Sequence, residues 1–139
     1  MSFKNKLVVT KTPLRISFSG GGTDMPYFYN KYGGITLSTI INKFIYVTVK
    51  LHKNFNEKYR LNYSDTEITN KIDKIKNLRI KETLRYFNVK EPIYINTISD
   101  IPYNTGLGSS SSFLVGLIKA IYKLKKKNVS KKKNCRNCI

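Results

Sequence analysis

The chain has 139 residues, which suits a single domain, and 40% of them are hydrophobic, enough to form a core. It contains no apolar run of about 18 residues, and charges interrupt the short apolar stretch near the N-terminus, so we expect neither a membrane span nor a signal peptide and expect a cytoplasmic protein. The formal net charge is +18, which favours anionic ligands or partners, nucleic acid among them.

Much of this charge lies at the C-terminal end. Residues 123–139 hold eight basic and no acidic residues, whereas the other 122 residues hold 18 basic and 8 acidic ones. The same segment contains Cys135 and Cys138, which form a single CxxC pair. A zinc site needs four ligands, and the only histidine, His52, is distant in the sequence, so we expect no metal or redox role for this pair.

Two strands are predicted at the N-terminal end, over residues 4–11 and 14–19, with Pro13 between them. The second strand alternates apolar and polar residues, as a half-buried strand does. It ends at the three glycines 20–22, which leave room for a ligand beside the backbone.

A short helical stretch is predicted over residues 25–32, directly after Thr23 and Asp24. Either residue could cap this helix, but a carboxylate such as that of Asp24 also accepts hydrogen bonds from ligand hydroxyl groups. Arg15 has two interpretations as well, a solvated strand residue or a phosphate ligand, since guanidinium matches phosphate geometry.

The middle of the chain predicts more strands. Residues 33–52 are rich in β-branched and aromatic residues and indicate two strands joined by a tight turn at residues 42–43. Residues 58–63 indicate another strand and residues 64–67 a turn or loop. Tyr59 and Tyr63 could stack on RNA bases, but we favour sheet positions for them.

A helix is predicted over residues 71–87, with Ile75, Leu78 and Leu84 on its buried side. Asn88 and Pro92 close it. The alternating strand 94–101 follows and leads the chain into a glycine-rich turn. Asp100 lies close to this turn, and we expect a strand-end role for it rather than a catalytic one.

The glycine-rich turn is followed by four serines, Ser109 to Ser112, and by a helical pattern of apolar residues at positions 114, 117, 118, 121 and 124. A flexible loop that leads into a helix start favours anion binding, because the first-turn N–H groups are unpaired and the helix dipole is positive there. The alternative is an ordinary turn with a serine N-cap. The lysine of a Walker loop is absent. The strands, the helix and the loop-helix unit together, without an internal repeat, indicate an α+β domain.

Two stretches resemble a known family. IPYNTGLGSSSS, residues 101–112, resembles the phosphate-binding motif of the GHMP kinases. TPLRISFSGGGTDMPYFYNKYGG, residues 12–34, resembles the substrate-side motif of their sugar-phosphate branch, with D-glycero-D-manno-heptose 7-phosphate kinases as the nearest likeness. The resemblance covers residues 3 to about 131. It implies the N-terminal GHMP kinase domain, a mixed sheet with packed helices similar to domain 2 of ribosomal protein S5, as an incomplete ATP-binding domain over residues 1–131.

The resemblance also implies site residues. The triphosphate of ATP would contact Gly106, Leu107, Gly108, Ser109, Ser110 and Ser111, and Ser110 would contact Mg²⁺. On the acceptor side the matching residues are Arg15, Thr23 and Asp24. The implied reaction is phosphoryl transfer from ATP to a sugar, for the heptose branch at the anomeric hydroxyl of heptose 7-phosphate, with fucose and related sugars as alternatives.

The C-terminal end departs from the family pattern. KLKKKNVSKK follows it, but KNCRNCI does not, and we interpret residues 132–139 as an aberrant basic tail produced by a frameshift or premature stop near Lys132 or Lys133. The family's catalytic aspartate and acidic Mg²⁺ ligand would lie beyond residue 139, so no catalytic residue is assigned. An inactive remnant of such a kinase and a basic nucleic-acid-binding module are the alternatives, the latter less favoured because the glycine-serine loop has no role in it. The sequence predicts no oligomeric state.

Overall fold

The computed structural model describes residues 7–52, 56–102 and 105–125. In chain order the strands and helices are β1 (Leu7–Ser19), α1 (Pro26–Tyr32), β2 (Leu37–Leu51), β3 (Tyr59–Asn62), β4 (Thr66–Thr69), the 3₁₀ turn η1 (Ile72–Lys74), α2 (Leu78–Tyr86), β5 (Ile93–Ser99) and α3 (Ser109–Leu124). Three predicted features lie outside the described residues: the start of the first predicted strand (residues 4–6), the basic residues from 126 onward and the CxxC pair.

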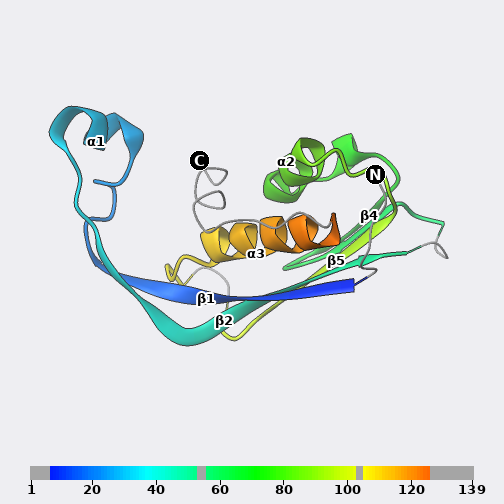
Figure 1. The fold of residues 1–139 in the computed structure, drawn as a ribbon, viewed down its shortest axis with the longest axis horizontal. Coiled ribbons are helices and arrows are strands. Elements are labelled where there is room, and N and C mark those ends of the chain that lie inside the picture. The colour runs from blue at the N-terminus through cyan, green and yellow to red at the C-terminus, as the bar shows by residue number, and fades with distance from the viewer. Residues whose placement is uncertain (1–6, 53–55, 103–104, 126–139) are drawn as a thin grey trace.

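The strands form one mixed sheet in the order β1-β2-β5-β3-β4. Among the strand pairs of the described residues, β3–β5 is parallel, whereas β1–β2, β2–β5 and β3–β4 are antiparallel. Helices α2 and α3 lie on one face of this sheet (Figure 1). The predicted α+β class, with a mixed sheet and packed helices, is confirmed.

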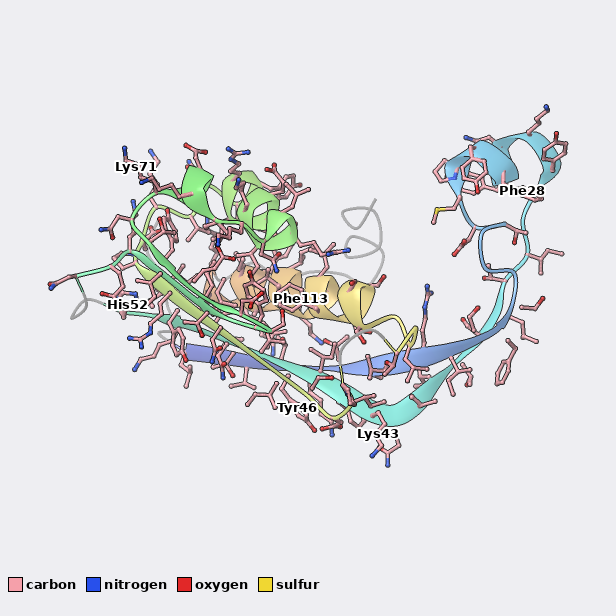
Figure 2. All side chains as sticks on the ribbon, turned by 180° about the vertical axis from the view of Figure 1, so that it is seen from behind. Phe28, Lys43, Tyr46, His52, Lys71 and Phe113 are labelled. Atoms are coloured by element: carbon pink, nitrogen blue, oxygen red, sulfur yellow. The ribbon has the colours of Figure 1, made fainter. Side chains whose placement is uncertain are left out.

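The core lies between the sheet and these two helices. Alternate residues of β2 and β5 are buried there, and α3 contributes its apolar stripe; the fully buried side chains include Val47, Val49, Ile93, Ile95, Leu117, Ile121 and Leu124. Figure 2 shows Tyr46 and Lys43 on the opposite face of the sheet, away from the helices. The apolar spacing of the last helix is thus confirmed as a core stripe, with Leu114 only half-buried.

The prediction of separate N-terminal strands was wrong. Residues 7–19 form one strand that continues through Pro13, and residues 37–51 form one strand in place of two strands with a turn at residues 42–43. Pro13 is tolerated because β1 is an edge strand. Residues 41–43 form a bulge: the pairing jumps from Pro13↔Phe44 to Arg15↔Ile40. The local turn signal therefore marks a register break (Pro13–Arg15 on β1, Ile40–Phe44 on β2), not a chain reversal.

The predicted helix over residues 71–87 was also wrong in its first half. The 3₁₀ turn Ile72–Lys74 is followed by a break, and α2 begins only after Asn77, whose side chain accepts a hydrogen bond from the N–H of Ile80. Of the expected buried positions, Ile75 and Leu84 are buried but Leu78 is 66% exposed, and Ile80 lies in the core instead. Asn88 does close the helix, in a left-handed conformation with φ 47°.

Two smaller predictions need correction. Thr66 and Glu67, expected in a loop, begin β4, which pairs with β3. The N-cap of α1 is Met25, which makes no side-chain capping bond, so neither Thr23 nor Asp24 caps this helix. Strands β3 and β5 were predicted correctly apart from their ends, and Tyr59 is a buried sheet residue as expected.

The distal ends of β1 and β2 form an arm that carries α1 away from the two other helices (Figure 1). No residue of α1 is buried. Large apolar side chains are exposed along the arm, among them Phe18, Tyr27, Tyr32, Ile35 and Ile40. Of the helices in the described ranges, none combines the length and apolar character that crossing a bilayer requires.

Candidate nucleotide site at the start of α3

The glycine-rich turn leads into α3 as predicted, but the cap differs from the serine N-cap alternative. Gly108 is the N-cap, in the left-handed conformation with φ 72° and ψ 22°, and no side chain caps the helix. The first helical hydrogen bond runs from the N–H of Ser112 to the carbonyl oxygen of Gly108 (3.0 Å). The N–H groups of Ser109, Ser110 and Ser111 therefore lie in the uncapped first turn, where an anion would be stabilised.

A pocket of about 210 Å³ lies beside this helix start. Residues of β2, β5, the start of α3, the turn after β3 and the start of α2 surround it. The lining residues are Ile45, Tyr63, Ser64, Asn77, Arg79, Thr97, Ser99, Ile101, Ser109, Ser110 and Phe113. Apolar and polar side chains line it together, as is usual for small-molecule sites.

A hydrogen-bond network holds the wall formed by Tyr63 and the start of α2. The Tyr63 hydroxyl donates a short hydrogen bond to Oε1 of Glu67, and this carboxylate also accepts from the backbone N–H groups of Lys76 (2.7 Å) and Asn77 (3.2 Å). Burial by itself raises the pKa of Glu67, but the hydrogen bonds from Tyr63 and the two N–H groups outweigh it and lower the pKa below its usual value. Burial and the neighbouring carboxylate raise the pKa of Tyr63. The wall is thus held by an ionised carboxylate and a neutral phenol.

One polar atom of the pocket lining has no partner among the described residues. Oγ1 of Thr97 is buried and makes no hydrogen bond. Thr97 follows Ile93 and Ile95 on the inner face of β5, where the next position is normally apolar. Buried hydroxyls are usually satisfied by protein, water or ligand, so this atom marks the pocket as a place for a polar molecule.

The candidate residues fall into two groups in space. Arg15 lies at the glycine-rich turn: its N–H donates to the carbonyl oxygen of Leu107 (3.2 Å), and a Cβ added to Gly108 would come within 3.1 Å of its Cγ. Thr23 and Asp24 lie at the arm, beside α1, which Figure 1 shows away from α3. The structure therefore brings Arg15, but not Thr23 and Asp24, to the predicted phosphate loop.

The hydrogen bonds of Thr23 and Asp24 stay within the arm. The Thr23 hydroxyl lies 2.8 Å from the carbonyl oxygen of Gly20 and 3.0 Å from that of Ile35, and Oδ1 of Asp24 accepts from the N–H of Gly22 (3.2 Å). The glycines differ from one another. A Cβ on Gly20 would lie 2.0 Å from the carbonyl oxygen of Ile35, so Gly20 permits a close approach of two chain segments, whereas Gly21 and Gly22 face open space. Only the latter two match the predicted room for a ligand.

The pocket residues outside α3 were missed by the sequence analysis. Tyr63 was treated as a sheet residue, and Asn77 and Arg79 were placed inside a longer helix. No local pattern points to them, because they meet only when β3, α2 and β5 pack together. Asp100 was placed correctly at a strand end: its Oδ2 accepts from the N–H of Phe44 (2.9 Å).

The GHMP kinases N terminal domain family matches residues 70–139, half of the chain. The chain therefore belongs to the GHMP kinase family. This agrees with the resemblance of the two sequence motifs, one of which lies outside the matched residues.

Two relatives are named as kinases of different sugars. The D-glycero-alpha-D-manno-heptose 7-phosphate kinase of Campylobacter jejuni is 30% identical over 125 residues, which are 83% of this chain and 37% of the relative. The galactokinase of Pyrococcus furiosus is 31% identical over 127 residues, 88% of this chain and 35% of the relative. The chain thus spans well under half the length of the relatives it matches.

Solved structures show the same fold. The structure of a D-glycero-D-manno-heptose 1-phosphate kinase from Bacteroides thetaiotaomicron superposes with a TM-score of 0.77 at 24% identity, covering 95% of this chain and 46% of the other. A mevalonate kinase from Methanococcus jannaschii gives a TM-score of 0.71 at 24% identity, with 97% and 45% covered. At this identity the likeness establishes the fold and leaves the substrate open.

Proposed function

We propose that this chain forms the nucleotide-binding part of an ATP-dependent sugar kinase. The observation that carries the proposal is the uncapped N-terminus of α3, which begins at the glycine loop and lies beside the pocket. The loop and the first-turn N–H groups, with Ser109, Ser110 and Ser111, suit the triphosphate. The pocket, whose lining combines apolar side chains with hydroxyl and amide groups, suits the nucleoside.

Arg15 supports the link between nucleotide and acceptor. Its side chain packs against Gly108, so its charge lies beside the phosphate loop although its motif is the acceptor-side one. A guanidinium at this place would neutralise charge on a transferring or acceptor phosphate. Thr23 and Asp24, which lie on the arm, remain the proposed contacts for hydroxyl groups of the acceptor.

The described residues do not form a complete Mg²⁺ site. Within the described part of the chain, no three His, Cys, Asp or Glu side chains gather where they could hold a metal ion, and the pocket lining contains no carboxylate. Mg²⁺ prefers carboxylate and phosphate oxygens. Ser110 is therefore proposed as one hydroxyl ligand only, and no step is derived through the ion.

Heptose 7-phosphate is the proposed acceptor, phosphorylated at its anomeric hydroxyl in a longer parent protein. The support is the 30% identity to the Campylobacter jejuni kinase together with the acceptor-side motif. Galactokinase matches at a similar identity, so galactose is a competing acceptor, beside the fucose and related sugars that the sequence motif leaves open.

The test is calorimetric titration of the 139-residue chain with ATP, beside its Gly108→Val and Ser110→Ala variants. Gly33→Ala is the control, since Gly33 has the same φ of 72° but lies at the end of α1, with open space where its Cβ would be. We expect ATP binding that Gly108→Val abolishes, Ser110→Ala weakens and the control retains. ATP binding that is equally strong in all variants would refute the site. Titration with heptose 7-phosphate and galactose then separates the acceptors.

A further inference from the structure

The phosphate loop is attached at several points to the register break between β1 and β2. On the β2 side, Phe44 and Asp100 exchange two hydrogen bonds: the N–H of Phe44 donates to Oδ2 of Asp100 (2.9 Å), and the N–H of Asp100 donates to the carbonyl oxygen of Phe44 (3.0 Å). This fixes the point where the chain leaves β5 and enters the loop.

On the β1 side the break holds the other end of the loop. The N–H of Arg15 donates to the carbonyl oxygen of Leu107 (3.2 Å), and the hydroxyl of Ser112 donates to the carbonyl oxygen of Pro13 (2.9 Å). Between these two positions Leu14 is completely buried. Because β1 is an edge strand, backbone groups that point away from β2 are free to bind the loop, and the register break lies between the two residues that do so.

Ser112 differs from the three serines before it. It is 8% exposed and its hydroxyl is used by Pro13, whereas Ser109 and Ser110 line the pocket and Ser111 is exposed. The fourth serine of the motif therefore holds α3 against β1 and does not line the pocket.

We propose that the register break is the anchor that holds the phosphate loop in its binding conformation, with Ser112 and Asp100 as positioning residues for nucleotide binding. The inference rests on the proposed function, since it presumes that the phosphates of a nucleotide bind at this loop. Its physical basis is that a loop held at both ends presents its N–H groups to an anion without a further loss of conformational entropy on binding.

The variants are Ser112→Ala, Asp100→Ala and Asp100→Asn. Asp100→Asn keeps an oxygen acceptor for the N–H of Phe44 and removes only the charge, so it should rescue positioning. Thr10→Val is the matched control. The Thr10 hydroxyl also joins β1 to α3, donating to the carbonyl oxygen of Gly116 (2.9 Å), but it does so away from the loop.

The measurement is calorimetric binding of ATP, tripolyphosphate and adenosine to the whole chain, with urea unfolding of each variant and amide exchange at Leu107 to Ser110. We expect Ser112→Ala and Asp100→Ala to weaken ATP and tripolyphosphate binding alike, by about 5–10-fold, as the loss of one positioning hydrogen bond implies. Adenosine binding should not change, and the loop amides should exchange faster. Asp100→Asn should bind like the unmodified chain, and Thr10→Val should lose stability without losing affinity.

The outcomes separate this inference from the proposed function. An unmodified chain that binds neither ATP nor tripolyphosphate would refute both. Normal binding by the unmodified chain and by Ser112→Ala and Asp100→Ala would refute the anchor alone. An equal loss in Thr10→Val would show that the effect is general destabilisation, and an equal loss in Asp100→Asn would show that the charge of Asp100, not its hydrogen bond, matters.

Discussion

Replacing Gly116 by alanine tests the close approach of α3 to the sheet. Gly116 is buried in the middle of α3, and a Cβ there would lie 2.9 Å from Oγ1 of Thr12, 3.1 Å from Cγ2 of Val47 and 3.2 Å from Oγ1 of Thr10. Helix propensity alone would make alanine more stable than glycine by about 1 kcal/mol. The crowding works in the opposite direction.

The expected cost exceeds that gain. Forcing a methyl group into a packed interface costs about 1–3 kcal/mol. Shifting α3 also strains the hydrogen bond from Thr10 to the carbonyl oxygen of Gly116, which contributes about 1 kcal/mol. We therefore expect Gly116→Ala to lower the free energy of unfolding by about 1–3 kcal/mol net.

Urea unfolding followed by circular dichroism measures this change, with Lys119→Ala on the exposed side of α3 as a near-neutral control. Thr12→Ala removes the nearest atom, so the double variant Thr12→Ala/Gly116→Ala should be more stable than the sum of the single changes predicts. A Gly116→Ala variant that is more stable than the unmodified chain, or strict additivity with Thr12→Ala, would refute the packing argument.

Three further predictions concern the pocket and the helix beside it. Thr97→Val keeps the shape and removes a buried hydroxyl without a described partner, so the ligand-free chain should gain about 1 kcal/mol in urea unfolding; a loss would show that the hydroxyl is satisfied. Because the folded-state pKa of Glu67 is lowered, its contribution to stability is present above the unfolded pKa and is lost as the pH falls through the folded value. The melting temperature should thus fall on acidification below about pH 4.3, the usual glutamate pKa, and less steeply in Glu67→Gln; identical profiles would exclude the network. Ile80→Ala should cost about 2–5 kcal/mol and Leu78→Ala under about 0.5 kcal/mol, and the reverse order would restore the helix face expected from sequence.

The sequence determined the features that depend on neighbouring residues. The helix from Ser109 onward and its buried stripe follow from the spacing of apolar residues, and the alternation in β5 follows from the two-residue period of a strand. The glycine loop at the start of this helix was predicted because Gly106 and Gly108 tolerate positive φ, and both adopt it. These are local properties, which the chain carries wherever it packs.

The tertiary structure decided the rest. Pro13 and residues 42–43 have the local signature of interruptions, but pairing over the full length of β1 and β2 outweighs it and turns both into parts of one register break. The pocket lining comes from segments as far apart as Ile45 and Phe113, and Arg15 reaches Gly108 only because β1 packs against α3. Such contacts depend on which strands become neighbours, and strand order is set by the burial of the whole sheet against α2 and α3, not by any short stretch of sequence.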